Sequence, residues 1–179
     1  NPFYKTSFQT DPTKSTAINF TNKYAELSFF TNPTQTFAKA NSNYSPQVKN
    51  NQIIYSSIFP NTDLVYTVNP NQLLEEFVVY DKNTALNMTK ISQTLDRSKI
   101  DSYKEVNGAI ELYKNEKLVA TIPRPVIYEK DDKSIRSYGL SYQVTPTNDD
   151  YLTITKVIDQ EGLEWLSDSK RSYPIVIDL

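Results

Sequence analysis

The strongest constraint on the fold is a series of short apolar or alternating runs, each followed by Asn, Asp, Pro or Thr. This pattern is typical of antiparallel sheets, because successive side chains of a strand point to opposite faces. Helical periodicity is nearly absent. The runs that we expect to form strands are residues 17–20, 25–30, 36–39, 52–58, 64–68, 73–80, 110–113, 118–122, 140–145, 151–158 and 173–177. The sequence therefore predicts an all-β fold, an antiparallel β-sandwich-like architecture of about 11 or more strands.

Turns between these runs depend on Asn and Asp, because the chain has only three Gly residues. Asn107 and Gly108 both tolerate a positive φ and fit a type I′ hairpin turn. Asn115 and Glu116 separate two apolar runs, which predicts a second hairpin. Most left-handed turn positions are therefore expected to carry Asn or Asp.

One short helix is predicted near Gln160–Ser167. Asp159 precedes it as the expected N-cap, and acidic residues lie in its first turns. Trp165 and Leu166 are expected to dock this helix onto a sheet. The polar residues that follow lead into the last strand.

A candidate domain boundary lies in the polar stretch of residues 81–103. We expect a single β-rich module over residues 1–179, with two β subdomains, 1–82 and 103–179, as the alternative. The first residues lack the features of a signal peptide, so the chain is expected to be a mature or excised part of a longer protein.

The composition limits the catalytic groups and the partners that this chain can have. The chain has no His and no Cys, which removes the commonest general base, the commonest zinc ligand and the thiolate nucleophile. A net charge of −2 without a Lys/Arg cluster argues against a nucleic-acid partner. No apolar run is long enough to span a membrane, and no cofactor or metal is expected.

Two adjacent carboxylates, Glu75 and Glu76, lie in an otherwise apolar run. Period-2 alternation places Glu75 on one face with Leu73 and Phe77, and Glu76 on the other face with Leu74. One of the two is expected to be partly buried and paired with a Lys or Arg, since an unpaired buried charge is costly. A structural ion pair is the leading interpretation.

An intramolecular Lys–Asn isopeptide bond, promoted by Glu75 or Glu76, is an alternative. Its candidate lysines are Lys39, Lys117 and Lys156, which lie within or beside predicted strands. An alternating strand places a lysine on its solvent face by default, so this alternative is not favoured.

Three further patterns have ordinary explanations. Residues 167–170 match Ser-x-x-Lys, but without the companion motifs they predict a solvated helix exit. Asp63 and the pairs at 131–132 and 149–150 could bind calcium, but their spacing favours solvated loop tips. The 13 Tyr residues could form a sugar-stacking surface, but most alternate with aliphatic residues and favour core packing.

Two segments of the chain carry a resemblance to a known family. The first, residues 53–79, runs from a strand into a Phe-Pro-Asn-Thr-Asp turn, a Tyr-x-Val strand and an acidic pair. The second, residues 164–178, contains Glu-Trp-Leu and a Tyr-Pro strand that ends in Ile-Asp. The motif residues are Phe59, Pro60, Asn61, Asp63, Tyr66, Glu75, Glu76, Trp165, Tyr173, Pro174 and Asp178.

Over about residues 18–178 the chain resembles the N-terminal β-rich module of wall-associated proteins, Rhs-type polymorphic toxins and adhesin-like proteins with DNRLRE domains. The resemblance implies a secreted or cell-surface location. It brings no catalytic residues, so the motif residues are expected to be structural, with Pro60 fixing a turn that Asp63 caps.

The function expected from these observations is that of a non-enzymatic structural or adhesive module of a large secreted or cell-surface protein. The alternatives are a carbohydrate- or cell-wall-binding module and a hydrolase that uses carboxylates. The expected partners are cell-wall or extracellular glycans and neighbouring domains of the same polypeptide.

Overall fold

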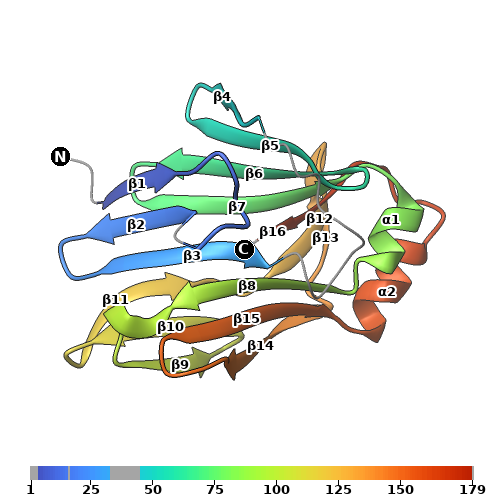
Figure 1. Ribbon diagram of the computed structural model, residues 1–179. Coiled ribbons are helices and arrows are strands. Elements are labelled where there is room, and N and C mark those ends of the chain that lie inside the picture. The colour runs from blue at the N-terminus through green and yellow to red at the C-terminus, as the bar shows by residue number, and fades with distance from the viewer. Residues whose placement is uncertain (1–3, 16, 33–44, 179) are drawn as a thin grey trace.

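The computed structural model describes residues 4–15, 17–32 and 45–178 and confirms the predicted all-β class (Figure 1). These residues form sixteen strands in three antiparallel sheets, together with two α-helices and one 3₁₀ helix.

The strands are β1 (Tyr4–Phe8), β2 (Ile18–Asn22), β3 (Glu26–Asn32), β4 (Gln47–Lys49), β5 (Gln52–Phe59), β6 (Thr62–Asn69), β7 (Gln72–Val79), β8 (Lys90–Asp96), β9 (Ser102–Val106), β10 (Ala109–Lys114), β11 (Lys117–Ile122), β12 (Val126–Glu129), β13 (Asp132–Ser137), β14 (Leu140–Pro146), β15 (Tyr151–Ile158) and β16 (Ile175–Asp178). The helices are α1 (Lys82–Asn87), the 3₁₀ helix η1 (Arg97–Lys99) and α2 (Gln160–Ser167).

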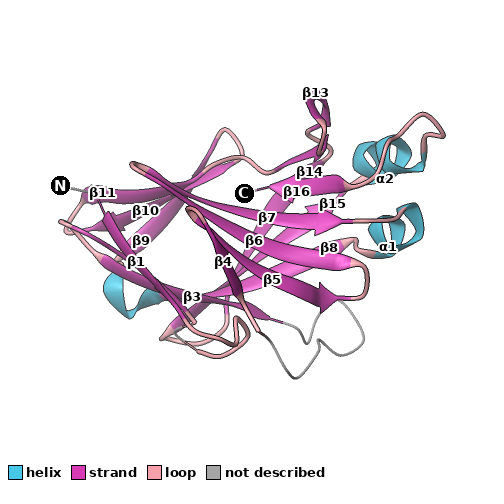
Figure 2. Ribbon diagram, turned by 90° about the horizontal axis from the view of Figure 1, so that it is seen from above, coloured by secondary structure: helices cyan, strands magenta, loops and turns pink. Residues whose placement is uncertain are grey.

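The two large sheets form the layers of the sandwich. One sheet has the strand order β1-β2-β3-β8-β15-β14, and the other has the order β13-β12-β16-β7-β6-β5-β4. The third sheet, β11-β10-β9, lies at one end of the sandwich, and both α-helices lie at the opposite end (Figures 1 and 2). The two ends of the molecule are therefore built from different elements.

The inner face of the six-stranded sheet packs against two partners and so takes part in two cores. Near the helices, Ile91 and Ile158 belong to the main core, which they share with residues of the seven-stranded sheet such as Phe77. Near the third sheet, Leu95 and Ile154 belong to a second core, which they share with β10 and β11. The inward-facing rows of β8 and β15 thus run from one core to the other.

The predicted turn chemistry is confirmed. Asn107 and Gly108 have φ values of 52° and 81°, and Asn115 and Glu116 have φ values of 49° and 62°. Asn61, between β5 and β6, also has a positive φ, of 50°. Asn therefore supplies left-handed positions that Gly fills in other sheet proteins.

The helix prediction was right for α2 but missed α1. The Asp159 side chain accepts a hydrogen bond from the Gly162 N–H at 3.0 Å, as expected of an N-cap. Residues 82–87 were expected to be strand or linker, but the Asp81 side chain caps α1 by accepting from the Thr84 N–H at 2.9 Å. Ala85 is buried in the main core, which holds this short helix in place.

Several strands were not predicted, and two of them, β13 and β4, are sheet edges that lack an apolar alternation. Five of the six residues of β13 are exposed, as befits the edge of a sheet, and all three residues of β4 are exposed. The other strands missed are β1, β8, β9 and β12. The strand predicted at 36–39 lies outside the described residues. Hydrogen bonds between β7 and β16 join segments on both sides of the candidate boundary, while the division into domains stays a prediction.

Two glycine backbones touch where α2 crosses the turn between β13 and β14. A Cβ atom on Gly162 would lie 2.2 Å from the carbonyl oxygen of Gly139 and 2.7 Å from a methyl carbon of Ile158. Only a residue without a side chain allows this approach.

We therefore predict that Gly162→Ala lowers the free energy of unfolding by about 1–3 kcal/mol, because the helix must move away from the sheet. Urea denaturation measures the change. Gln160→Ala, at an exposed position of the same helix, is the matched control and should change stability by less than about 0.5 kcal/mol. Equal effects of the two substitutions would contradict this account of the contact.

Candidate functional site

A cluster of buried polar side chains lies where the two cores meet. The Glu75 carboxylate is its centre: Oε1 accepts from the Lys156 ammonium at 2.8 Å and Oε2 accepts from the Tyr66 hydroxyl at 2.7 Å. The Gln93 amide N–H also donates to Oε2. Glu75 and Lys156 are each only 2% exposed, so this ion pair is shielded from water.

The strand register explains why these residues meet. Tyr66 of β6 is paired directly with Glu75 of β7, so both side chains leave the seven-stranded sheet on the same face. On the opposite sheet, Gln93 of β8 is paired with Ile154 of β15. Lys156 lies two residues beyond Ile154 and therefore projects from the same face as Gln93, as its diagonal neighbour.

Burial shapes the electrostatics of the cluster. A buried ion pair is tolerated only where further hydrogen bonds satisfy the charged groups, and here the carboxylate accepts from three donors. Burial, reinforced by the negative charge of Glu75, raises the pKa of Tyr66 well above its usual value. The Tyr66 hydroxyl therefore stays protonated and donates its hydrogen bond to Glu75.

A cavity of about 530 Å³ opens beside this cluster, where the three sheets meet. Tyr66, Glu75 and Gln93 form part of its wall. Its other lining residues are Tyr4, Phe20, Asn22, Leu27, Phe29, Asn71, Gln72, Leu73, Leu95, Leu112, Val119, Ala120, Thr121, Ile122, Pro123 and Ile154. The cavity thus leads from exposed residues of the β6–β7 turn and β11 to the buried polar cluster.

Such an arrangement can bind a small molecule. Most of the wall is apolar, and a few polar groups converge on one region of it, as in typical ligand sites. The charges of Glu75 and Lys156 neutralise each other, so the cluster offers hydrogen bonds without a net charge.

The prediction for the acidic pair is confirmed in its main point. Glu75 faces the interior and is paired with a lysine, whereas Glu76 faces the other side of the sheet. There Glu76 accepts from the Tyr128 hydroxyl and from Lys133 at 3.3 Å. The Tyr128 hydroxyl also donates to Asp178 Oδ2 at 3.5 Å. The motif residue Asp178 therefore lies near Glu76 and not in the cavity wall.

The prediction for Lys156 was wrong. A lysine of an alternating strand was assigned to the solvent face, but Lys156 shares its face with the core residues Ile154 and Ile158. Lys117 is exposed as expected, and Lys39 lies outside the described residues. Gln93 was not among the predicted site residues, although Ile91 and Leu95 flank it at core spacing, a pattern that indicates its inward orientation.

In the turn from Phe59 to Asp63, the hydrogen bonds of Asp63 differ from those predicted. Asp63 does not cap the Pro60 turn; its side chain accepts from the Ser57 N–H at 2.8 Å and from the Tyr80 hydroxyl at 2.7 Å. Burial and this carboxylate raise the pKa of Tyr80 to about 12. Phe59 stacks on Phe77 in the core at 6.2 Å, so the turn is a folding element.

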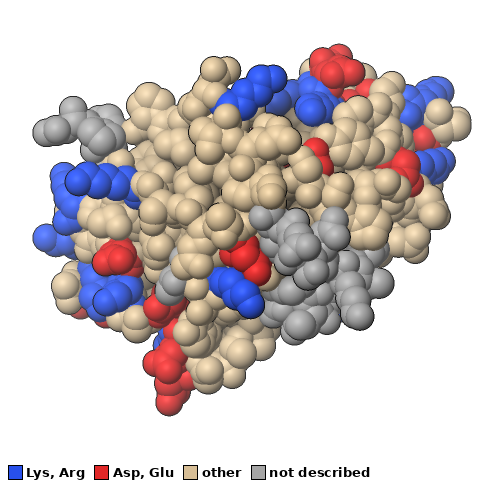
Figure 3. Space-filling view, turned by 45° about the horizontal axis from the view of Figure 1, so that its top comes forward, with Lys and Arg blue, Asp and Glu red and all other residues tan. Residues whose placement is uncertain are grey.

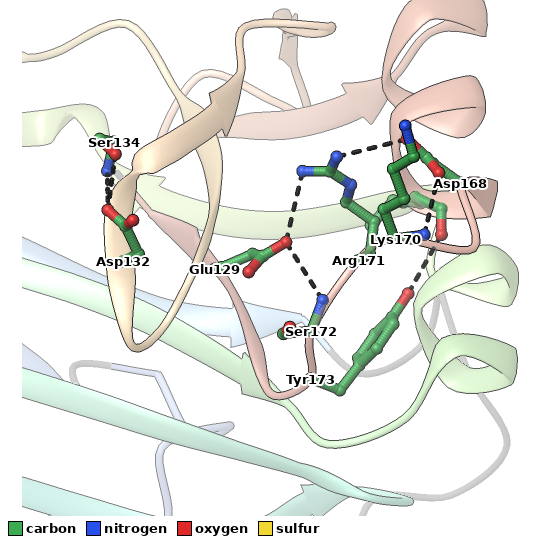
Figure 4. A network of polar contacts seen from close by, with 9 residues as sticks. Glu129, Asp132, Ser134, Asp168, Lys170, Arg171, Ser172 and Tyr173 are labelled. Carbon is green, nitrogen blue, oxygen red and sulfur yellow. Dashed lines mark hydrogen bonds and ion pairs between the residues drawn. The ribbon is translucent and has the colours of Figure 1, made fainter.

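A second polar network holds the C-terminal motif (Figure 4). Glu129 accepts from the Arg171 guanidinium at 3.3 Å and from the Ser172 N–H at 3.1 Å. Arg171 also lies over the half-buried ring of Trp165, 4.9 Å from its centroid. The Tyr173 hydroxyl donates to the Leu166 carbonyl at 3.3 Å, and the peptide bond to Pro174 is cis. This network joins α2 to the start of β16.

The Ser-x-x-Lys pattern lies at the exposed end of α2. The Ser167 hydroxyl donates to the Glu164 carbonyl at 2.9 Å, and the Lys170 side chain is exposed. These positions agree with the predicted helix exit.

The acidic loop tips do not converge. Asp132 accepts from the Ser134 N–H at 3.0 Å and from its hydroxyl at 2.6 Å, and these bonds lower the pKa of Asp132. Over residues 4–15, 17–32 and 45–178, no group of three or more Asp or Glu residues is arranged to hold a metal ion.

Among the described residues, the exposed tyrosines Tyr24, Tyr80 and Tyr138 lie in three different connections between elements. Tyr24 lies on the β2–β3 turn, at the end opposite the helices, whereas Tyr80 immediately precedes α1 (Figure 1). Most of the other tyrosines with resolved contacts pack within the sandwich, in agreement with the core interpretation.

The fold and the site together define an antiparallel β-sandwich module with an internal cavity lined partly by a buried polar cluster. Comparison with known proteins finds similarity to the tRNA nuclease WapA of Bacillus subtilis strain 168. The two are 27% identical over 135 residues, which cover 72% of this chain and 5% of that protein. No family model matches the chain, and no solved structure matches it.

This similarity corrects the predicted function. A structural or adhesive module was expected, with a glycan-binding module and a hydrolase that uses carboxylates as alternatives, but the similar protein is named as a tRNA nuclease. The prediction against a nucleic-acid partner, made from the net charge and the lack of a Lys/Arg cluster, conflicts with the same finding. Within the described part of the chain, no helix has the length and hydropathy needed to cross a membrane.

We predict that Lys156→Met lowers the free energy of unfolding by about 3–5 kcal/mol, because it leaves the Glu75 carboxylate buried without its cation. Urea denaturation at neutral pH measures the loss. Lys117→Met, at an exposed position, should change stability by less than about 0.5 kcal/mol. The double variant Lys156→Met/Glu75→Leu should recover part of the loss; a double variant weaker by the sum of the two single effects would contradict the pairing.

Proposed function

We propose that this chain is a ligand-binding module of a large polypeptide of toxin or nuclease type that acts outside the cell. The similarity to WapA supports the type of polypeptide, and the resemblance of residues 53–79 and 164–178 to modules of wall-associated proteins supports the location. The matched region covers 5% of the length of WapA, so the function proposed for this chain rests on the residues of this chain.

The cavity beside Glu75 is the observation that carries this proposal. Its volume of about 530 Å³ lies within the range of small-molecule sites in proteins. Tyr66, Glu75 and Gln93 place a few polar groups in a mainly apolar wall, which is the usual way in which a small-molecule site orients its ligand.

The chemistry of the wall indicates the class of ligand. Leu27, Leu112 and Val119 are buried apolar residues of the wall, so the ligand must be mainly apolar. The neutralised pair of Glu75 and Lys156 cannot offset the desolvation of an ion. The ligand is therefore an uncharged molecule with one or a few hydrogen-bonding groups.

We predict saturable binding of the neutral apolar dye phenylnaphthylamine, seen as a rise in dye fluorescence when the purified chain is titrated. Ala120→Phe places a ring into the cavity wall and should weaken binding by about tenfold or more.

Ala109→Phe is the matched control. Ala109 is also half-buried and lies in the neighbouring strand β10, but it does not line the cavity, so this variant should bind the dye as the parent does. Circular dichroism confirms that each variant is folded. No saturable binding by the folded parent chain, or equal binding by the two variants, would contradict a cavity site.

A second candidate function is contact with RNA at an exposed aromatic and cationic group. Tyr138 is 41% exposed, and the guanidinium groups of Arg124 and Arg136 lie 4.8 Å and 5.9 Å from its ring centroid. Aromatic rings flanked by cations stack on unpaired bases and attract phosphates. On the face shown in Figure 3, Lys and Arg are interspersed with Asp and Glu, so this face has no continuous basic surface.

For this candidate we predict that Tyr138→Ala weakens tRNA binding by about 1–3 kcal/mol, the usual contribution of one stacked base. Fluorescence anisotropy of labelled tRNA at low and physiological salt measures it. Tyr24→Ala is the control, because Tyr24 is 49% exposed and has Lys23 over its ring at 4.6 Å. Equal effects of both variants would contradict a contact at Tyr138.

The same incubation separates binding from catalysis. As a binding module, the chain leaves the tRNA intact. Cleavage that Glu75→Gln abolishes would make the buried cluster a catalytic centre and overturn the binding-module proposal.

A further inference from the structure

The most unusual feature of the buried cluster is that one carboxylate holds both an amine and a carboxamide. Glu75 Oε1 accepts from Lys156 Nζ at 2.8 Å, and Oε2 accepts from the Gln93 amide nitrogen. Hydrogen bonds alone satisfy these groups. The same geometry also suits a reaction. The Lys156 amine is a nucleophile, the Gln93 amide nitrogen is a leaving group, and the Glu75 carboxylate that holds both can carry a proton.

We propose that Lys156 and Gln93 become joined by an intramolecular amide bond, formed with the release of ammonia and assisted by Glu75. The bond would tie β15 to β8 through their side chains. This inference goes beyond the proposed ligand binding and does not depend on it; the ion pair of Glu75 and Lys156 is the state of the chain before this bond forms.

The placement of the three residues supports the reaction. Lys156 and Gln93 are diagonal neighbours on adjacent strands of one sheet, within reach of each other for long side chains. Glu75 faces both of them from the opposite sheet. Holding the reacting groups together in this way replaces an encounter in solution, which is a large part of the barrier to amide exchange.

The step balances in atoms and charge. Glu75 accepts one proton from the Lys156 ammonium, and the resulting amine attacks the carboxamide carbon of Gln93. The Nζ–Cδ bond forms, the Cδ–Nε2 bond breaks, and a second proton from Nζ leaves with the amide nitrogen as ammonia. The product is a neutral secondary amide that retains one N–H, beside a protonated Glu75, and no further reactant is needed.

Burial favours this outcome. Lys156 and Glu75 are 2% exposed and Gln93 is 7% exposed, so little water competes with the amine for the carboxamide. The reaction replaces a buried ammonium and a buried carboxylate with neutral groups, which removes the desolvation penalty of the pair. The cavity, whose wall includes Gln93 and Glu75, gives the released ammonia a way out.

The Tyr66 hydroxyl is a positioning group. It donates to Oε2 at 2.7 Å and is fully buried, so it fixes the carboxylate between the amine and the carboxamide.

High-resolution mass spectrometry of the intact folded chain tests the proposal. We expect a mass lower than that of the sequence by one ammonia molecule, and a protease digest should contain a branched peptide that joins the segments around Lys156 and Gln93. Glu75→Gln keeps the shape of the side chain but removes the proton carrier, so this variant should have the full sequence mass. Lys117→Arg is the control and should retain the loss of ammonia.

The mass of the parent chain decides the matter even if a variant fails to fold. The full sequence mass, unchanged after prolonged incubation of the folded chain, would overturn the proposal. A loss of one water molecule would also overturn it, because it would place the bond between Lys156 and Glu75. Loss of ammonia without the branched peptide would do the same. Dye binding is measured separately, so either proposal can fail while the other stands.

Discussion

The ion pair between Glu75 and Lys156 joins the two layers of the sandwich at the point where its two cores meet. Each partner comes from a different sheet, and each lies in a row of inward-facing apolar residues. A shift of either strand by one residue would turn its charged group to the outer face and leave the other charge buried alone. The ion pair therefore fixes the position of one sheet relative to the other more strictly than apolar packing does.

The cavity follows from the same arrangement. Near the helices the two large sheets pack directly on each other, whereas at the opposite end the third sheet packs on the six-stranded sheet and forms a separate core. The cavity lies where these packings meet, so its wall takes residues from all three sheets and from the polar cluster. Ligand binding and amide formation would thus use one region of the molecule, reached from the end that carries the β6–β7 turn.

The opposite end of the molecule is built from the two α-helices and a polar network. There, α1 and α2 lie together and the network of Glu129, Arg171 and Asp168 ties the exit of α2 to the last strand (Figure 4). The buried Glu129 carboxylate also accepts from the Ser172 N–H, whereas the Nε of Arg171 is buried without a hydrogen-bond partner among the described residues. The motif residues predicted from the sequence are divided between two regions: Tyr66 and Glu75 line the cavity, and Trp165 and Tyr173 lie at the helical end.

The sequence by itself determined the features that depend on near neighbours. Alternation in β6, β7 and β15 predicted strands, Asn107 and Gly108 predicted a turn, and Asp159 predicted a helix start, because each of these depends on a few adjacent residues. Alternation also indicated which residues share a face with Glu75. Only the tertiary structure decided which face is inside and which partner lies opposite: Lys156 is 81 residues from Glu75, and the strand period is the same for a lysine in solvent and a lysine in the core. The cavity, the strand order of the sheets and the role of Gln93 arise from contacts between distant segments, which no local pattern specifies.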